Sequence, residues 1–414
     1  MSGFGERLRK AVVRIAATQE SDLRFLPGLE RSLVPVLSAA STLYRFGTVV
    51  RRLLYHLGIL GRTRLPIPVI SVGNLTWGGT GKTPMVEYLA RHYLAARVCP
   101  LILSRGYRGG DEVRLLQKHL QDTPTKFGIG PNRAKVALSI LQQRVGERSN
   151  WPESITTQKP KDFLRDHGEE IGVAILDDGM QHWTLERDLE IVMINVVSLW
   201  GNGRLVPRGP MRESLEALHR AHVVVLHHAT LVPDDKVKSI RRNLEPFLKK
   251  GSIVLSSHMR PLRFYRHTQP SNSLSETPLL KVKDAVILCV SAVGCPESLD
   301  LVLMQEGASH VERLDFSDHH YFKHENLKEI VEVFKQLQLR FPCQRVMLVT
   351  TEKDYMRDPA VMAELGNLGD GVFVLQSTLE IIDSFGNDQA FRELLSSVCC
   401  QRDVSRMTLS SWSP

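Results

Sequence analysis

The segment from Thr76 to Thr83, TWGGTGKT, has residue types and a spacing that suit binding of nucleotide phosphates. It matches the P-loop pattern G-x-x-x-x-G-K-[ST], except that threonine replaces the first glycine. The glycines let backbone N–H groups surround phosphate oxygens, Lys82 can reach the β and γ phosphates, and the Thr83 hydroxyl can bind Mg²⁺. A glycine-rich turn alone is usually just a turn, but this one joins a buried strand to a helical pattern. We predict a nucleotide site of Thr76, Trp77, Gly78, Gly79, Thr80, Gly81, Lys82 and Thr83.

Two adjacent aspartates later in the chain suit the same chemistry. Asp177 and Asp178 directly follow the apolar run Val173–Leu176, so they stand at the end of a buried strand. Carboxylates beside a P-loop can hold Mg²⁺ through its hydration shell. Alone, an Asp-Asp-Gly string would indicate a turn. With the P-loop upstream, it predicts that at least one of the two aspartates belongs to a metal site, without deciding which.

The nucleotide is predicted to be ATP. Guanine-specific switch proteins carry Asn-Lys-x-Asp or Thr-Lys-x-Asp late in the domain. The nearest string here is TEKD at residues 351–354, in which lysine and aspartate are adjacent. Because that spacing does not fit guanine recognition, ATP with Mg²⁺ is expected.

Alternating strand and helix patterns form the framework that must position these groups. Such alternation predicts an α/β fold, namely a P-loop NTPase-like, mostly parallel sheet with helices on both faces. The strands are predicted from apolar runs at residues 69–72, 98–104, 173–176, 189–195 and 223–226.

The composition changes after Leu262. A Ser-, Thr- and Pro-rich loop at 268–278 is followed by predicted strands at 285–290 and 346–350 around a helix at 326–339. These elements predict a second, smaller α/β domain.

The N-terminal segment contains two amphipathic patterns. From Leu33 to Leu60, apolar residues recur at helical spacing, while Arg45 and Arg52 share another face. The arginines interrupt the apolar stretch, so we expect this helix not to span a bilayer but to lie on a membrane or to pack as a core helix. Residues 1–20 form a basic amphipathic pattern typical of a mitochondrial presequence, with a plain helix as the alternative.

Composition sets the broad class. The 414 residues, 43% of them hydrophobic and 24% charged, indicate a folded protein of two domains. The net charge of +8 suits a membrane surface or a phosphorylated substrate, and the scattered basic residues show no nucleic-acid pattern. Six cysteines without a C-x-x-C pair indicate a reducing compartment. The expected ranges are 1–31 (presequence or extension), 32–64 (membrane-associating helix), 65–260 (P-loop domain), 261–400 (smaller domain) and 401–414 (tail).

Six motifs between Leu33 and Asp354 occur in an order typical of one family. They are PVISVGNLTWGGTGKTP, LSRGYRG, DDGMQHWTLERDLEI, GRLVPRGPMRES, DFSDHH and VTTEKD. Together they resemble the tetraacyldisaccharide 4′-kinases, also called lipid A 4′-kinases, which are membrane-associated P-loop enzymes. The resemblance implies an ATP-dependent kinase that phosphorylates the 4′-hydroxyl of a tetraacyldisaccharide 1-phosphate, giving lipid IVA in lipid A biosynthesis.

The resemblance also implies partners and site residues. In this family a G-D-E carboxylate, paired with a histidine, is thought to take the acceptor proton; the matching residues are Asp111 and His319. The expected partners are an acylated disaccharide phosphate lipid and a membrane surface, with a monomeric, mitochondrial protein and no nucleic acid. Lys82 is expected to be catalytic, and the expected metal residues are Thr83, Glu112, Asp177 and Asp178.

Two arginines are expected to meet a phosphate of ATP or of the substrate. They are Arg212 and, in the string GPNRAK, Arg133; plain surface arginines are the alternative. Asp318, His319, His320 and His324 also allow a metal interpretation, because His320 and His324 stand four residues apart.

The chain departs from the family pattern before the expected base. Only Arg108, Gly109 and Gly110 separate Tyr107 from Asp111, whereas bacterial members have a longer segment. SAVGCPES also replaces the usual G-I-G-N-P string. The alternatives are a P-loop kinase acting on another glycolipid or metabolite, and an ATP-driven switch or metallochaperone.

Overall fold

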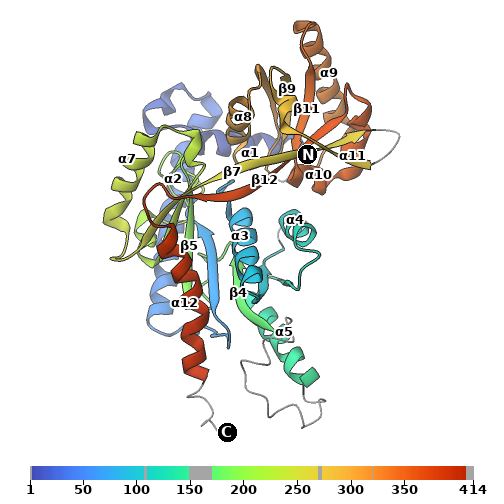
Figure 1. Cartoon of the computed structure of the whole chain (residues 1–414). Coiled ribbons are helices and arrows are strands. Elements are labelled where there is room, and N and C mark those ends of the chain that lie inside the picture. The colour runs from blue at the N-terminus through green and yellow to red at the C-terminus, as the bar shows by residue number, and fades with distance from the viewer. Residues whose placement is uncertain (1, 107–109, 149–169, 269–272, 319, 407–414) are drawn as a thin grey trace.

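The computed structural model describes residues 2–106, 110–148, 170–268, 273–318 and 320–406. Figure 1 shows two halves, one above the other, joined by a long pair of strands. The predicted fold, a mostly parallel sheet with helices on both faces plus a second, smaller α/β unit, is confirmed.

The first half is built on strands that are mostly buried. Burial on both faces explains why these segments are apolar runs rather than alternating patterns. They pair in parallel in the order β3-β2-β4-β1-β5-β6, and only the short β3 was not predicted. The strands are β1 (Val69–Asn74), β2 (Cys99–Ser104), β3 (Lys126–Ile129), β4 (Ile171–Asp177), β5 (Leu189–Asn195) and β6 (Val223–His227).

Helices connect and cover these strands. The helix that follows the phosphate loop buries Met85, Val86 and Leu89 completely, in one core cluster with residues of the strands. The described helices that follow these strands along the chain are α3 (Lys82–Ala95), α4 (Asp111–His119), α5 (Arg133–Arg148) and α7 (Asp234–Leu244).

The second half repeats the α/β pattern on a smaller scale. Its parallel strands are β9 (Val286–Ser291), β10 (His310–Asp315) and β11 (Val346–Thr351). Helix α9 (His324–Arg340) buries Ile330 and Phe334 completely against these strands. The other helices are α8 (Pro296–Gln305), α10 (Glu352–Arg357) and α11 (Pro359–Glu364).

Two long strands join the halves: β7 (Ile253–Thr268), which also pairs with β8 (Ser273–Thr277), and β12 (Val372–Ile382). They are antiparallel, while β7 is parallel to β6 and β12 is parallel to β11. At one end of this ribbon the last residue of β6, His227, pairs with Ser257; at the other, the last residue of β11, Thr351, pairs with Leu375. The carboxyl ends of both sets of parallel strands therefore point toward the middle of the ribbon and toward each other.

The C-terminal helix α12 (Asp388–Arg406) returns to the first half. Phe391 and Leu395 are fully buried in the same core cluster as Ile70 and Leu89. The sequence-based range 261–400 assigns this helix to the smaller domain. Its packing leads us to propose instead that α12 folds with the P-loop half, because its apolar face is covered by residues of that half.

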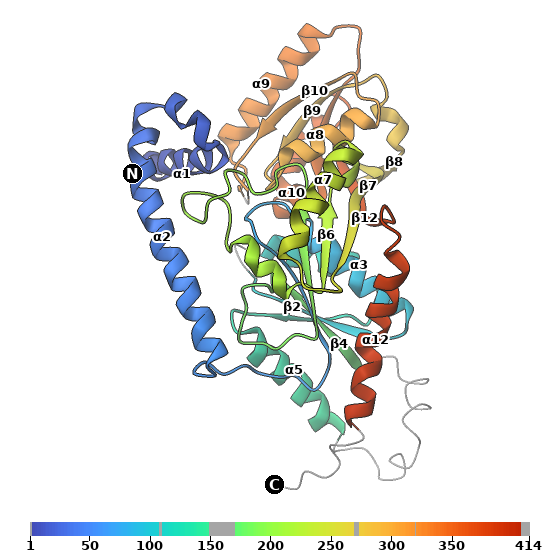
Figure 2. The same ribbon diagram turned by 90° about the vertical axis from the view of Figure 1, so that its left-hand side faces the viewer.

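The N-terminal helices α1 (Ser2–Ala17) and α2 (Gly28–His56) lie along one side of the molecule (Figure 2). The predicted helical pattern of residues 33–60 is confirmed as a helix up to His56, residues 57–60 form a turn, and the helix is exposed rather than core. Among the described helices, α2 is the one that by length and composition could cross a membrane, which the sequence analysis did not expect because of its arginines. Ser41 and Tyr44 nevertheless donate hydrogen bonds to the carbonyls of Leu205 and Arg212, so α2 packs along the protein.

Candidate active site

The phosphate loop turns sharply into α3, as its glycines require. Gly78 and Gly81 have φ values of 97° and 79°, in the left-handed region that favours glycine. A Cβ atom at Gly81 would come within 2.5 Å of the His227 ring. Because α3 begins at Lys82, the N–H groups of its first turn have no helical partners and carry the positive end of the helix dipole. The loop therefore has the backbone conformation of an anion site.

Two asparagine side chains hold this loop from behind. Asn74 donates a hydrogen bond to the Thr80 hydroxyl at 2.8 Å, and Asn195 donates one to the Gly79 carbonyl at 2.9 Å. Both asparagines end strands of the parallel sheet and are buried. The loop conformation is thus set by the sheet before any ligand binds.

A cavity of about 590 Å³ opens beside the loop, a volume typical of ligand sites. Residues Gly78–Thr83 line it, with parts of α3, α4, α8, α10 and β12, the ends of β6 and β11 and the loop after β9. Thr76 and Trp77 are not among the lining residues. The Trp77 N–H donates to the Pro210 carbonyl at 2.9 Å, so this part of the motif ties the loop to the segment after β5. The cavity is therefore formed by both halves.

The loop after β9 touches the phosphate loop directly. A Cβ atom at Gly294 would lie 2.2 Å from the Gly79 nitrogen. The backbones of the two loops therefore approach more closely than any other residue at 294 would allow. From the sequence, this segment was distinctive only as a departure from the family string.

Asp177 and Asp178 end β4 in different surroundings. Arg212 Nη1 donates to both carboxylate oxygens of Asp178, at 2.7 and 2.9 Å, and Lys82 Nζ lies 3.6 Å from Oδ1. Burial would raise the pKa of Asp178, but the charges of Lys82 and Arg212 outweigh it and lower this pKa. Burial, followed by the charges of Glu112 and Asp178, raises the pKa of Asp177 to about 7. Among the described residues, Asp177 Oδ1 is buried without a hydrogen-bond partner.

These groups fit Mg²⁺ bound together with a nucleotide. Mg²⁺ keeps several waters and takes one or two carboxylates plus substrate phosphates. The orphaned Oδ1 of Asp177 supplies such a carboxylate, and Thr83 lines the cavity in the first turn of α3. In the described part of the chain, no group of three or more His, Cys, Asp or Glu could hold a metal by itself. The residues present thus fit a metal shared with phosphates rather than an all-protein cage.

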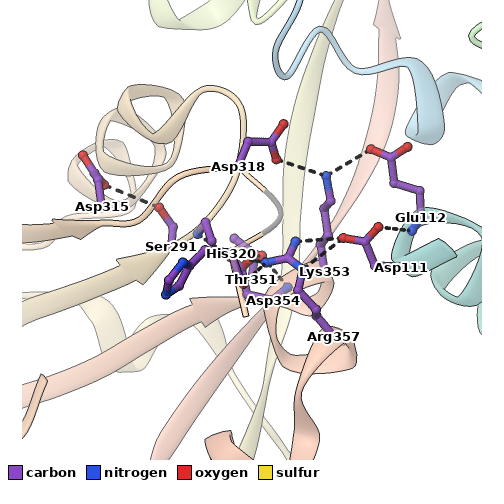
Figure 3. A network of polar contacts seen from close by, with 11 residues as sticks. Asp111, Glu112, Ser291, Asp315, Asp318, His320, Thr351, Lys353, Asp354 and Arg357 are labelled. Carbon is purple, nitrogen blue, oxygen red and sulfur yellow. Dashed lines mark hydrogen bonds and ion pairs between the residues drawn. The ribbon is translucent and has the colours of Figure 1, made fainter. Parts of the chain in front are cut away.

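Asp111, the expected base, begins α4 and is held by an arginine from the other half (Figure 3). Arg357 donates to Asp111 Oδ2 from Nε at 3.1 Å and from Nη2 at 2.8 Å. Asp111 Oδ1 accepts the Glu112 N–H at 3.1 Å. The exposed fractions of the Arg357 and Asp111 side chains are only 1% and 3%. A buried ion pair therefore joins the two halves beside the cavity.

A second cation of α10 contacts the next acid of α4. Lys353 Nζ lies 3.0 Å from Glu112 Oε1 and 3.6 Å from Asp318 Oδ1. Burial would lower the pKa of Lys353, but the charges of Glu112 and Asp318 outweigh burial and raise it. Lys353 is thus a stable cation. Glu112, expected to bind metal, has an ammonium group as its partner here.

The two predicted phosphate-binding arginines differ. Arg133 is buried, and its Nη1 donates to the carbonyls of Asp177 and Asp178 at 2.8 and 3.1 Å. It fixes the backbone of the aspartate turn. Neither Arg133 nor Arg212 is among the residues that line the cavity, so as ligand contacts the two differ in exposure only. The side chain of Arg212 is 29% exposed, and it forms an ion pair with the carboxylate of Asp178 in the same turn. Arg212 is therefore the better placed of the two to meet a ligand.

The predicted histidines divide into two cases. His319 lies outside the described residues. His320 Nε2 is 2.9 Å from Asn326 Oδ1, whereas the largely exposed His324 lies 3.4 Å from Glu364. These two side chains have separate partners, so their spacing of four residues gives no support to a shared metal.

Sequence reasoning missed several residues that shape the site. Lys353 belongs to the family motif VTTEKD, to which no role was assigned, and Arg357 follows that motif on the same short helix. Charge patterning cannot indicate which distant acid each cation meets. Another missed group is His119, which bridges Glu87 of α3 and Glu352 of α10, at 2.8 and 3.3 Å. Burial would lower the pKa of His119, but its contacts to Glu352 and Glu87 outweigh this and raise it to about 9.

Comparison with known proteins agrees with the motifs. The sequence model of the family described as tetraacyldisaccharide-1-P 4′-kinase (LpxK) matches residues 33–399. A protein of Arabidopsis thaliana named probable tetraacyldisaccharide 4′-kinase, mitochondrial, is 43% identical over 387 residues, 92% of this chain and 96% of its own. The tetraacyldisaccharide 4′-kinase of Halothermothrix orenii is 31% identical over 349 residues, 78% of this chain and 82% of its own.

A solved structure supports the fold. LpxK from Aquifex aeolicus, crystallised in complex with ATP, superimposes with a TM-score of 0.54 at 24% identity. The match covers 89% of this chain and 98% of the bacterial one. The architecture of both halves is therefore shared with that protein.

The bridging position of His119 predicts a pH-dependent stability. Because its folded pKa of about 9 exceeds the ordinary 6.5, its stabilisation is complete below pH 6.5 and is lost as the pH rises through 9. The facing charges are Glu87, Glu352 and Arg91, whose guanidinium donates to the His119 carbonyl. Between pH 6.5 and 9.5, wild type should lose roughly 2–4 °C more in Tm than His119→Gln. The exposed His324→Gln is the control; equal pH dependence of wild type and His119→Gln would contradict the assignment.

Proposed function

The chain belongs to the tetraacyldisaccharide 4′-kinase family, and on that premise we propose that it transfers the γ-phosphoryl group of ATP to the 4′-hydroxyl of a tetraacyldisaccharide 1-phosphate. The product is lipid IVA. The observation that carries the proposal is the cavity itself. It has Lys82 and Thr83 of the phosphate loop on one wall and Glu112, next to the proposed base Asp111, on another. A phosphate donor and an acceptor hydroxyl can meet in such a space.

Binding of ATP is the task of the first half. The N–H groups of the loop and of the first turn of α3 take phosphate oxygens, and Lys82 neutralises charge on the β and γ phosphates. Asp178 keeps Lys82 and Arg212 in place, since it lies within ion-pair distance of both. Preformed donors of this kind lose little free energy to reorganisation during the reaction.

Mg²⁺ is the expected metal. Thr83 and Asp177 would hold it, and Glu112, also expected to bind the metal, is paired with Lys353 in this structure. When bound, the metal neutralises phosphate charge that develops during transfer. Asp177 is proposed over Asp178 because its carboxylate oxygen lacks a hydrogen-bond partner among the described residues, whereas Asp178 is held by Arg212.

Transfer needs an oriented acceptor more than a strong base, because a sugar hydroxyl loses its proton as the new bond forms. In the proposed step the acceptor oxygen bonds to the γ phosphorus, and the bond from that phosphorus to the β–γ bridging oxygen breaks, releasing ADP. The hydroxyl proton passes to Asp111, with His319 as the expected tuning partner. Asp111 stands at the first position of α4, beside the cavity-lining Glu112.

Arg212 is proposed to meet a phosphate of ATP or of the lipid. Its bonds to Asp178 and Gln181 in the described structure all come from Nη1. The other nitrogens of the guanidinium can then take a phosphate oxygen without breaking those bonds. Arg133 is proposed to support the aspartate turn, given its bonds to the two carbonyls there.

The transfer reaction is testable with γ-labelled ATP, Mg²⁺ and tetraacyldisaccharide 1-phosphate in detergent micelles. Wild type should yield lipid labelled at the 4′ position. Lys82→Ala should lower transfer by at least about 10²-fold, and Asp111→Asn should lower kcat by about 10²–10⁴-fold while ATP still binds.

The exposed Lys335→Ala on α9 serves as the matched control and should retain wild-type activity. Absence of label on the lipid, with ATP bound, would refute this acceptor. ATP hydrolysis that needs no acceptor would then favour a nucleotide-driven switch, and label on another glycolipid would favour a kinase of different specificity.

We further propose that α2 attaches the protein to a membrane surface, as an acylated acceptor requires. One face of α2 carries exposed large apolar side chains, and Arg45 and Arg52 are exposed on the same helix. Apolar residues with nearby arginines suit an anionic lipid interface. The exposed apolar residues are Leu29, Val36, Leu43, Phe46, Val49, Leu53 and Leu57.

Replacing both Leu43 and Phe46, which are 73% and 70% exposed, by glutamate should reduce binding to vesicles containing anionic phospholipid by more than about tenfold. The loss follows from two missing apolar contacts and added repulsion. A matched double variant at Met304 and Leu339, exposed apolar residues of the second half, should bind as wild type does. Flotation with vesicles measures the bound fraction, and equal losses in both variants would contradict a role for α2.

A mitochondrial location is part of the same proposal. Residues 1–20 have the pattern of a presequence, and the similar Arabidopsis protein is named mitochondrial. The end of α1 is nevertheless built into the fold: Ile15 is fully buried, and its carbonyl accepts from Asn202 at 3.1 Å. We therefore expect any cleavage to occur before Ala11, which N-terminal sequencing of protein recovered from mitochondria would test. A mature N-terminus beyond Ile15, or absence from the organelle, would contradict this.

A further inference from the structure

Helix α10 presents two cations, one turn apart, to the two acids that begin α4. Arg357 meets Asp111, and Lys353 meets Glu112 (Figure 3). The helices come from different halves of the molecule. Of the two cations, Arg357 is the more deeply buried, and its hydrogen bonds go to Asp111, Asp354 and the carbonyl of His320.

We propose that Arg357 is the positioning residue of the base: it holds Asp111 Oδ2 through two N–H donors, so that Oδ1 is the oxygen that takes the acceptor proton. This inference rests on the proposed function, because it assigns a role within the same transfer step. Arg357 keeps its own protons throughout. It is a residue that acts through Asp111 and not a group that touches the reacting atoms.

The first support is the geometry at Oδ2. Nε and Nη2 of Arg357 lie 3.1 and 2.8 Å from this oxygen, so both of its lone pairs accept N–H bonds. An oxygen engaged twice by a guanidinium is a poor proton acceptor, and proton transfer therefore falls to the other oxygen. Two donors from one planar group also fix the orientation of the carboxylate, which a single bond would not do.

The second support is that Arg357 is itself held rigidly. Its Nη1 donates to Asp354 Oδ1 at 2.8 Å and to the His320 carbonyl at 3.2 Å. Burial would lower the pKa of Arg357, but the charges of Asp354 and Asp111 outweigh burial and raise it, so the guanidinium stays charged. The guanidinium of Arg357 thus forms ion pairs with two buried carboxylates, those of Asp111 and Asp354. The nearest further charges are those of Lys353 and Glu112.

The network also reaches the phosphate loop. Asp354 Oδ2 accepts the Ala292 N–H at 3.2 Å and the Thr351 hydroxyl at 2.8 Å. Ala292 belongs to the loop in which Gly294 packs against Gly79. Alignment of the base therefore depends on how the second half sits on the nucleotide site. The bonds run from Ala292 through Asp354 and Arg357 to Asp111.

The test compares Arg357→Met and Arg357→Lys with Asp111→Asn and with the double variant Asp111→Asn/Arg357→Met in the lipid transfer assay. Arg357→Met should lower kcat about 10²-fold with KM for ATP unchanged, because the base loses its alignment. Arg357→Lys keeps the charge but not the two-pronged contact, and should lower kcat about tenfold. In the Asp111→Asn background, Arg357→Met should change kcat by less than about threefold, because its effect passes through Asp111.

Arg345→Met is the matched control, since Arg345 also holds an aspartate, Asp370, with two nitrogens in the second half but away from the cavity. Thermal melting identifies any variant that is not folded; if Arg357→Met is not, Arg357→Lys decides. A wild-type kcat in the folded Arg357 variants, or an equal loss with and without Asp111, would overturn the inference while the kinase assignment stands. No transfer by the wild type would overturn the proposed function and this inference together.

Discussion

The antiparallel pairing of β7 with β12 is the constraint on which the rest of the structure depends. Each of these strands continues a set of parallel strands, β7 beside β6 and β12 beside β11. Because the pairing reverses the strand direction and offsets the two sets along the ribbon, their carboxyl ends face each other. Loops at the carboxyl ends of parallel strands are where α/β proteins bind ligands. Here two such edges share one cavity. The first half supplies the phosphate loop and the acid Glu112, and the second half supplies the cation Lys353.

The division of charge between the halves follows from this arrangement. The first half provides acids at the start of α4 and the end of β4, and the second half provides Lys353 and Arg357 on α10. Burying any of these charges alone would cost several kcal/mol, so each half is poorly satisfied by itself. Pairing across the boundary offsets that cost and makes the position of Asp111 a property of the assembled molecule. In the proposed role of Asp111 as the base, such a partner would fix where its carboxylate takes the proton.

The exposed helix α2 connects this site to the surroundings of the protein. Tyr44 of α2 donates a hydrogen bond to the carbonyl of Arg212, and the side chain of Arg212 holds Asp178 beside the phosphate loop. If α2 rests on a membrane, the hydrogen bond from Tyr44 links the membrane-bound helix directly to the loop that carries Arg212. This arrangement suits a soluble nucleotide and a lipid acceptor that must meet in one cavity, because the lipid can remain close to the interface while its sugar reaches inward.

The sequence by itself determined the parts of this protein whose residues are local. The phosphate loop needs its glycines, lysine and threonine within eight positions, and the aspartates follow their strand directly, so both were predictable from spacing. The strand runs and the helical pattern after Leu33 were predictable for the same reason, but the pattern left open whether that helix lies on a membrane or in the core. The family motifs indicated Asp111 as the base and His319 as its partner, and His319 lies outside the described residues.

Tertiary structure alone decided that Arg357 holds Asp111, since 246 positions separate them. It also decided that Gly294 touches Gly79, that Arg133 is buried as a support, and that Asp177 rather than Asp178 keeps an unsatisfied oxygen. Contacts between distant segments depend on how strands cross over and reverse, and a linear pattern of hydrophobicity and charge does not specify which distant groups meet.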